Sequence, residues 1–126
     1  TVCSGEIIQS HRKGQFKLDQ SDYLNIIRMK TGELFSLSCE LGGSLAGANT
    51  SETQALRRYG MALGTAYQIY DDCLDLFGTE SESGKSLGTD IVGGKATLPI
   101  LLLLERVSQL LRLLLSGQLS IHQVVK

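Results

Sequence analysis

Residues 67–78 read YQIYDDCLDLFG, and the polar residues of this stretch recur at the spacing of an α-helix. Positions i, i+3, i+4 and i+7 line one helix face, and here they are Gln68, Asp71, Asp72 and Asp75. Like charges at these intervals each destabilise a helix by a few tenths of a kcal/mol. Mg²⁺ binds one or two carboxylates together with water and phosphate oxygens, and would neutralise such a face. The stretch therefore predicts a helix with a divalent-cation site, and a solvated acidic face is the alternative.

Helical spacing of apolar residues continues on both sides of this stretch, and no segment alternates between apolar and polar residues as a half-buried strand does. We therefore predict an all-α chain with five or six helices, forming a single helical domain over residues 1–126. The main helices are expected at these positions: one ending near Gln9, one from about Tyr23 to Gly47, one from about Ser51 to Phe77, and one after Thr97.

Capping residues mark the expected ends of these helices. Ser21 or Asp22 is expected to cap the second helix, and Ser51 forms a capping box with Gln54 at the start of the third. Gly78 is expected to end the third helix. Pro99 fits the first turn of the last helix, where a missing N–H is harmless. Residues 79–94 are rich in Gly, Ser and acidic residues and are expected to form a loop.

The composition excludes several classes of protein. Of 126 residues, 42% are hydrophobic, which is enough to build a core. The 12 basic and 13 acidic residues give a net charge of −1, without the basic excess of nucleic-acid-binding domains. The longest apolar run, residues 98–104, is far shorter than the roughly 20 residues of a membrane span.

Cysteine usage indicates the compartment. The three cysteines are widely spaced and fit neither a disulfide framework nor a zinc site: Cys3, Cys39 and Cys73. A reducing compartment is therefore expected, the cytoplasm, or an organelle if a targeting segment lies upstream. Thr1 is not an initiator methionine, so the sequence is expected to start within a longer protein.

Three lysines are candidates for binding an anion beside the carboxylates. Lys30 precedes Thr31 and lies in register with an otherwise apolar stripe, where it meets an anion or extends its ammonium group to solvent. Lys85 lies in a Gly/Ser segment ten residues after Asp75, and the alternative is an ordinary surface lysine. Lys95 comes just before a predicted helix N-terminus, which favours anions, or belongs incidentally to a helix-start signal.

The order of these motifs resembles the trans-isoprenyl diphosphate synthases, the polyprenyl synthase family. Residues 67–78 look like the second aspartate-rich motif of that family, and residues 83–90, SGKSLGTD, look like the loop that follows it. Three other segments match family patterns: GEIIQ at 5–9, KTGEL at 30–34 and GKATLP at 94–99. The resemblance runs from about Gly5 to Leu104, and the combination is far more specific than DDxxD alone.

The resemblance implies an all-helical bundle around an apolar cavity, the isoprenoid (terpenoid) synthase fold, in a protein that is usually a homodimer. It implies condensation of isopentenyl diphosphate with an allylic diphosphate. In that reaction Mg²⁺ bridges aspartates and the allylic diphosphate and draws charge off the leaving group. The allylic cation is attacked by the double bond of isopentenyl diphosphate, and a proton is lost.

The resemblance also implies roles for individual residues. Metal binding falls to four carboxylates, with Asp90 acting through water: Asp71, Asp72, Asp75 and Asp90. The allylic diphosphate would be held by Lys30, Lys85 and Lys95. Thr31 and Gln68, together with Lys30, would line the reacting carbon and steady the cation.

Part of the family pattern is absent from the sequence. There is no second DDxxD, and the upstream basic cluster that binds isopentenyl diphosphate is missing as well. The chain is therefore expected to be the C-terminal part of a prenyl synthase, carrying one half of the site and inactive alone. Two alternatives stay open: a non-catalytic helical subunit that completes or regulates a partner synthase, and an inactive truncated protein.

Overall fold

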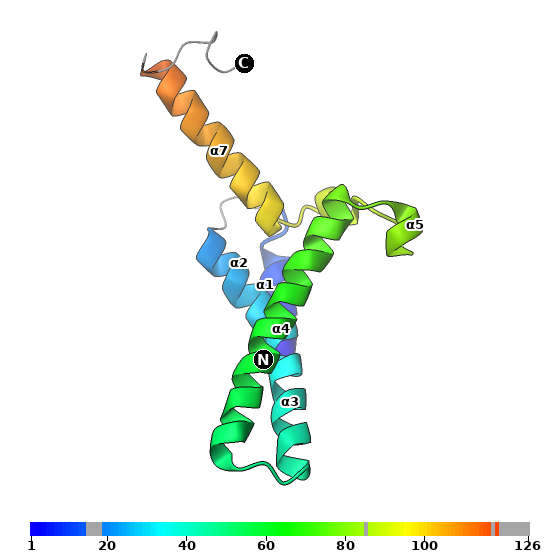
Figure 1. The fold of residues 1–126 in the computed structure, drawn as a ribbon. Coiled ribbons are helices and arrows are strands. Elements are labelled where there is room, and N and C mark those ends of the chain that lie inside the picture. The colour runs from blue at the N-terminus through cyan, green and yellow to red at the C-terminus, as the bar shows by residue number, and fades with distance from the viewer. Residues whose placement is uncertain (15–18, 85, 117, 119–126) are drawn as a thin grey trace.

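The computed structural model describes residues 1–14, 19–84, 86–116 and 118, and every regular element among them is helical (Figure 1). The elements are α1 (Val2–His11), α2 (Gln20–Ile27), the π-helical turn η1 (Arg28–Gly32), α3 (Glu33–Leu45), α4 (Thr50–Phe77), α5 (Glu80–Ser83), α6 (Thr89–Val92) and α7 (Leu98–Leu115). The predicted all-α class is confirmed.

Helix α4 is the longest element, and it carries the acidic stripe. It begins with a capping box in which Asn49 Oδ1 accepts from Glu52 N at 3.0 Å and Glu52 Oε2 accepts from Asn49 N at 2.8 Å. The predicted box from Ser51 is wrong, because Asn49 caps the helix two residues earlier and leaves Ser51 inside the first turn. The helix ends at Gly78, as predicted.

The single helix predicted from about Tyr23 to Gly47 is interrupted. Asp19 caps α2, its side chain accepting from Asp22 N at 2.8 Å, so the predicted caps at Ser21 or Asp22 are wrong. Residues 28–32 then form the π-helical turn η1 before α3 begins. A π-turn inserts extra residues into the helical repeat and rotates the side chains within it, so the register expected for Lys30 changes.

Helices α3 and α4 form an antiparallel hairpin and lie side by side in Figure 1. Two glycines on α4 permit the close approach. A Cβ at Gly60 would lie 2.5 Å from the Phe35 carbonyl oxygen, and one at Gly64 would lie 2.9 Å from Phe35 Cβ. The Phe35 and Tyr67 rings also stack, with centroids 5.7 Å apart. This hairpin holds the N-terminal half of α4 in place.

The segment 79–94 was predicted to be a loop, and it contains two single-turn helices, α5 and α6. Gly84 and Gly88 adopt positive φ angles of 65° and 73°, a backbone conformation that glycine adopts without steric cost. The segment returns to α4, because Gly88 N donates to the Asp75 carbonyl oxygen at 2.9 Å.

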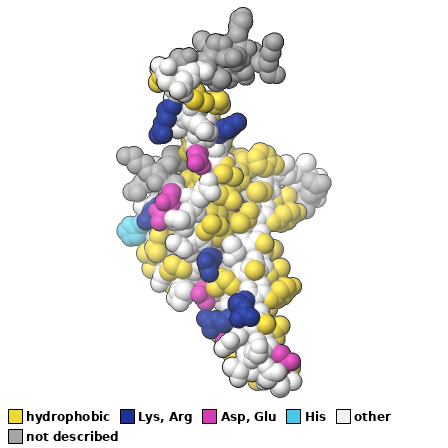
Figure 2. Space-filling view, turned by 60° about the vertical axis from the view of Figure 1, so that its left-hand side comes forward, with side chains coloured by type: hydrophobic (Ala, Val, Ile, Leu, Met, Phe, Trp, Pro, Cys, Tyr) yellow, Lys and Arg dark blue, Asp and Glu magenta, His cyan; other side chains and the backbone are white. Residues whose placement is uncertain are grey.

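Helix α7 begins after Thr97 with Pro99 in its first turn, as predicted, and projects away from the other helices (Figure 1). The buried hydrophobic core of the described residues is small: Tyr23, Ile26, Ile27 and Leu101. Hydrophobic side chains spread over much of the face in Figure 2. Within the described part of the chain, no helix combines the length and apolar character that crossing a membrane requires.

Candidate active site

The polar residues of the α4 stripe lie in different environments. Asp72 and Asp75 are 6% and 4% exposed, and Gln68 is 9% exposed. Asp71 is half-buried. A solvated acidic face is therefore wrong for Asp72 and Asp75, because α4 turns these carboxylates into the protein. Carboxylates this deeply buried need donors or cations around them.

Asp72 is held by hydrogen-bond donors from two helices. The Tyr23 hydroxyl of α2 donates to Asp72 Oδ2 at 2.6 Å, and Gln68 Nε2 donates to Asp72 Oδ1 at 3.0 Å. Burial raises the pKa of Asp72, while these two hydrogen bonds oppose the rise. Burial and the Asp72 carboxylate together raise the pKa of Tyr23, so its hydroxyl stays protonated and available as a donor.

Gln68 also joins Asp72 to the Lys-Thr motif. The Thr31 hydroxyl, in the π-turn, donates to Gln68 Oε1 at 2.7 Å. Two residues that were singled out from separate motifs are thus in direct contact, although 37 positions separate them in the sequence. A π-turn is a frequent feature of functional sites, where it redirects side chains.

Lys30 lies against α1. Its ammonium group donates to Gln9 Oε1 at 3.1 Å and forms an ion pair with Glu6 Oε1 at 3.4 Å. The simple extension into solvent that the apolar stripe suggested is wrong, because α1 covers this position and a Cβ at Gly5 would lie 2.9 Å from Lys30 N. The charge of Lys30 also lowers the pKa of Asp72, although the net shift of that pKa is upward.

Asp75 anchors the segment that follows α4. Its Oδ1 accepts from the Thr89 hydroxyl at 3.0 Å, and its Oδ2 accepts from Asp90 N at 3.1 Å. The predicted site residues Asp75 and Asp90 are thereby brought together from two helices. The backbone carbonyl of Asp90 in turn accepts from Lys95 N at 2.8 Å.

Asp90 and Lys95 pair through their side chains as well, with Lys95 Nζ donating to Asp90 Oδ1. Burial lowers the pKa of Lys95, but the hydrogen bond and charge of Asp90 raise it more, with smaller contributions from Asp72 and Asp75. The net shift is upward, so Lys95 is a cation at neutral pH. The structure therefore places this lysine within electrostatic range of three predicted metal-binding carboxylates.

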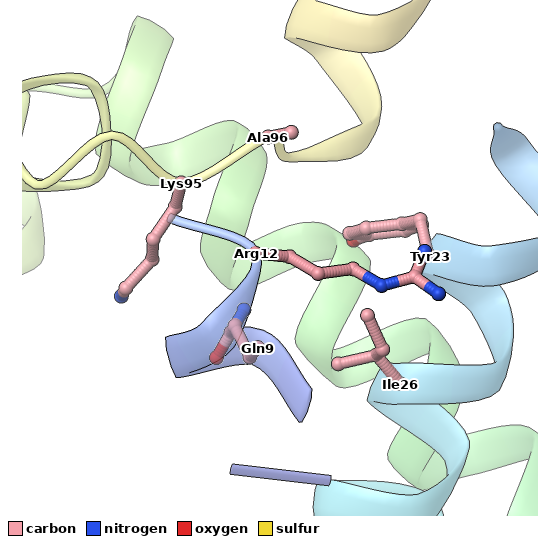
Figure 3. A pocket seen from close by; sticks show the side chains of 6 residues that line it. All are labelled: Gln9, Arg12, Tyr23, Ile26, Lys95 and Ala96. Carbon is pink, nitrogen blue, oxygen red and sulfur yellow. The ribbon is translucent and has the colours of Figure 1, made fainter. Parts of the chain in front are cut away.

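A small pocket opens between Lys95 and Tyr23 (Figure 3). Its lining comes from α1, the turn after it, α2 and the segment before α7: Gln9, Arg12, Tyr23, Ile26, Lys95 and Ala96. Arg12 donates to Asp22 Oδ2 at 2.6 Å. The pocket adjoins both the Asp72–Tyr23 hydrogen bond and the Asp90–Lys95 ion pair.

Metal binding by the carboxylates of α4 stays a prediction. Among the described residues, no three His, Cys, Asp or Glu side chains are grouped closely enough to hold a metal ion by themselves. The donor set still fits Mg²⁺, which often takes only one or two protein carboxylates and completes its shell with water and phosphate oxygens. Lys85, a predicted diphosphate ligand, lies outside the described residues.

Two site residues were not identified from the sequence. Tyr23 donates to Asp72, and Thr89 donates to Asp75. Tyr23 carried a usable signal, because a tyrosine at a core position usually has a hydrogen-bond partner for its hydroxyl. Thr89 carried none, because its contact depends on how residues 79–94 fold back.

Comparison with known proteins identifies the family of this chain. The family model described as polyprenyl synthetase matches residues 1–124. Heptaprenyl diphosphate synthase component 2 of Bacillus subtilis (strain 168) is 41% identical over 104 residues, covering 82% of this chain and 30% of the relative. Octaprenyl diphosphate synthase of Escherichia coli (strain K12) is 36% identical over 100 residues, covering 79% of this chain and 31% of the relative.

Solved structures give the same result. Heptaprenyl diphosphate synthase from Staphylococcus aureus superposes with a TM-score of 0.81 at 33% identity, covering 86% of this chain and 34% of that one. A polyprenyl synthase from Caulobacter crescentus CB15, in complex with calcium and isoprenyl diphosphate, gives 0.81 at 43% identity, covering 84% of this chain and 32% of that one.

The chain thus spans about a third of the length of the relatives it matches. Over that length it has the all-α isoprenoid synthase fold of those proteins. The motif order, the helical architecture and the family match over nearly the whole chain lead to one assignment. The chain belongs to the polyprenyl synthetase family.

Proposed function

We propose that this protein acts in a Mg²⁺-dependent prenyltransferase that condenses isopentenyl diphosphate with an allylic diphosphate. The observation that carries the proposal is the set of buried carboxylates on α4, with Lys30 and Lys95 within electrostatic range, in a chain of the polyprenyl synthetase family. The relative from C. crescentus binds a divalent cation together with an isoprenyl diphosphate, which is the ligand pair such a site would take.

The carboxylates and lysines divide between the two parts of this ligand. Asp71 and Asp75 would face the metal, with Asp72 beside them and Asp90 acting through water. Lys30, Lys85 and Lys95 would hold the diphosphate. Bound Mg²⁺ supplies charge neutralisation of the leaving diphosphate. Lys30 and Lys95 would exchange their present partners, Glu6 and Asp90, for phosphate oxygens.

The bond changes define what the other residues must do. The allylic C–O bond breaks and diphosphate leaves with the electron pair. The π electrons of isopentenyl diphosphate form the new C–C bond, and loss of a proton restores a double bond. Thr31 and Gln68 would line the reacting carbon, and their oxygen dipoles would steady its positive charge.

A complete site requires more than the 126 residues of this chain. The sequence has one DDxxD, so we expect the second aspartate-rich motif that the family resemblance implies to come from elsewhere. We propose that the chain is the C-terminal part of a single helical synthase domain, active as a homodimer. The alternative is a non-catalytic subunit of a separate synthase; the B. subtilis relative is itself named as one component of an enzyme.

Prenyl transfer by the protein purified from its natural source tests the proposal. Labelled isopentenyl diphosphate and allylic diphosphates of increasing length are supplied with Mg²⁺ or with EDTA. We expect labelled product only with Mg²⁺, and a loss of turnover of about a hundredfold or more in Asp71→Asn. Glu80→Gln, which changes an exposed acid on α5, is the matched control and should behave as wild type.

Two outcomes would count against the proposal. Absence of product with every allylic diphosphate would contradict the prenyltransferase assignment. Product that forms only when a separate synthase chain is added, and at the same rate in Asp71→Asn, would favour the non-catalytic alternative.

A further inference from the structure

A continuous line of hydrogen bonds crosses the interior from the π-turn to α2. The Thr31 hydroxyl donates to Gln68 Oε1 at 2.7 Å, and Gln68 Nε2 donates to Asp72 Oδ1 at 3.0 Å. The Tyr23 hydroxyl closes the line by donating to Asp72 Oδ2 at 2.6 Å. Tyr23 is only 2% exposed, and Gln68 and Asp72 are also buried. No buried side-chain nitrogen or oxygen among the described residues lacks a partner.

The chemistry of the four side chains fixes the direction of this line. An ionised carboxylate can only accept hydrogen bonds, so Gln68 must turn its amide nitrogen towards Asp72. The amide oxygen of Gln68 then faces Thr31, which must donate its single proton to that oxygen. The orientation of Gln68 is therefore dictated by Asp72, and the Tyr23 hydroxyl fixes the Asp72 carboxylate in turn.

The direction decides which charge the Thr31 hydroxyl presents to a ligand. With its proton committed to Gln68, Thr31 has only oxygen lone pairs left to offer, which suits a positively charged group. If the Gln68 amide were reversed, its nitrogen would donate to Thr31 and free the hydroxyl proton to point outwards. The reversed arrangement would present positive charge instead and would disfavour a cation.

We infer that Tyr23 and Asp72 are positioning residues that act through the Gln68 amide to hold Thr31 as a lone-pair donor to the developing cation. Asp72 in this role is an internal acceptor, with both oxygens engaged by Tyr23 and Gln68. The inference rests on the proposed prenyl transfer, and it gives Asp72 a positioning task instead of a metal-binding one.

Steady-state kinetics of the complete synthase containing this chain test the inference, with Tyr23→Phe and Asp72→Asn. We expect kcat to fall about tenfold to a hundredfold in both variants. The KM for the allylic diphosphate and the Mg²⁺ concentration for half-activation should stay within about twofold of wild type, because the line does not contact the diphosphate. Tyr70→Phe, an exposed tyrosine on α4, is the matched control and should keep the wild-type kcat.

The double variant separates positioning from simple loss of packing. Tyr23 acts only through Asp72, so Tyr23→Phe should lower kcat no further once Asp72→Asn is present. A metal-free spectroscopic measurement gives independent evidence. The side-chain amide signals of Gln68 in NMR spectra should shift in both variants and remain unchanged in Tyr70→Phe.

Three results would overturn the inference. The first is wild-type kcat in Tyr23→Phe and Asp72→Asn. The second is a Mg²⁺ requirement raised about tenfold in Asp72→Asn and unchanged in Tyr23→Phe, which would make Asp72 a metal ligand. The third is a Gln68 amide signal that neither variant changes. If wild-type protein transfers no prenyl group, the proposed function fails instead, and the NMR arm still tests the hydrogen-bonded line.

Discussion

At the scale of single residues, the site is built from carboxylates that each have a dedicated partner. Asp90 pairs with Lys95, Asp75 accepts from Thr89, and Asp72 accepts from Tyr23. Buried carboxylates in this protein are therefore held in place by specific donors before any ligand arrives. The hydrogen bonds to Asp72 and Asp75 fix these carboxylates before binding, whereas the proposed diphosphate binding would have to break the Asp90–Lys95 pair.

The Asp90–Lys95 pair gives the unfolding free energy a defined dependence on pH. The pKa of Lys95 is raised above 10.5 in the folded protein. The stabilisation is fully present below the unfolded value of 10.5 and is lost as pH rises through the folded pKa. We expect wild type to lose more stability than Lys95→Met between about pH 9 and pH 12 in urea titrations.

Lys13→Met, at an exposed lysine, is the control for this titration and should follow the wild-type curve. Parallel curves for wild type and Lys95→Met over the whole range would contradict a raised pKa of Lys95 in the folded protein.

The capping box of α4 allows a second test at single residues. Asn49→Ala removes the side chain that accepts from Glu52 N, and we expect it to lower the unfolding free energy by about 0.5–2 kcal/mol. Ser51→Ala should change it by less than about 0.5 kcal/mol, because Ser51 does not cap the helix. Chemical denaturation of both variants measures the difference. A larger effect at Ser51 than at Asn49 would contradict the assignment of Asn49 as the cap of α4.

At the scale of elements, the α3–α4 hairpin depends on glycines that have no room for a side chain. Gly60→Ala would place a Cβ 2.5 Å from the Phe35 carbonyl oxygen, so the helices must separate. We expect a loss of about 1–3 kcal/mol in unfolding free energy. Gly42→Ala on α3 is the matched control, since its Cβ meets nothing within 4 Å.

Gly42→Ala should instead stabilise the protein by about 0.5–1 kcal/mol, because alanine is the better helix former. Thermal unfolding compares the two variants directly. Equal stability of Gly60→Ala and Gly42→Ala would mean that α3 and α4 are not packed as closely as the structure has them.

The helical period of residues 67–78 was enough to predict α4 and its carboxylate face, because that pattern is local. The π-turn at Arg28–Gly32 could not be predicted, since its residues suit an α-helix equally well and packing against α1 and α4 decides the outcome. The need of a core tyrosine for a hydrogen-bond partner was a usable signal at Tyr23, but the identity of the partner could not be predicted because Asp72 is 49 positions away in sequence.

At the scale of the whole molecule, many large hydrophobic side chains of the described residues are exposed, and they spread over much of the face in Figure 2. Leu45 and Leu115 are 89% and 87% exposed, and Phe77 is 75% exposed. An apolar groove lies between the end of α4 and α7, lined by Cys73, Leu76, Phe77, Leu98, Pro99, Leu102 and Leu103. Surfaces of this kind mark contacts with further protein or with apolar ligands.

We therefore expect the 126-residue chain, expressed by itself, to bind a hydrophobic dye such as ANS and to self-associate. Phe77→Lys should reduce dye binding, because it places a charge beside the groove between α4 and α7. Dye fluorescence and sedimentation velocity measure both properties. A monodisperse monomer without dye binding would contradict this expectation.

We propose that α4 presents a divalent-cation site that binds a diphosphate. Isothermal titration calorimetry of a non-hydrolysable allylic diphosphate into the protein, with Mg²⁺ or with EDTA, tests this site in wild type and Asp71→Asn. We predict binding that requires Mg²⁺ and weakens about tenfold or more in the variant. Equal affinity in the presence of EDTA, or in Asp71→Asn, would contradict the claim.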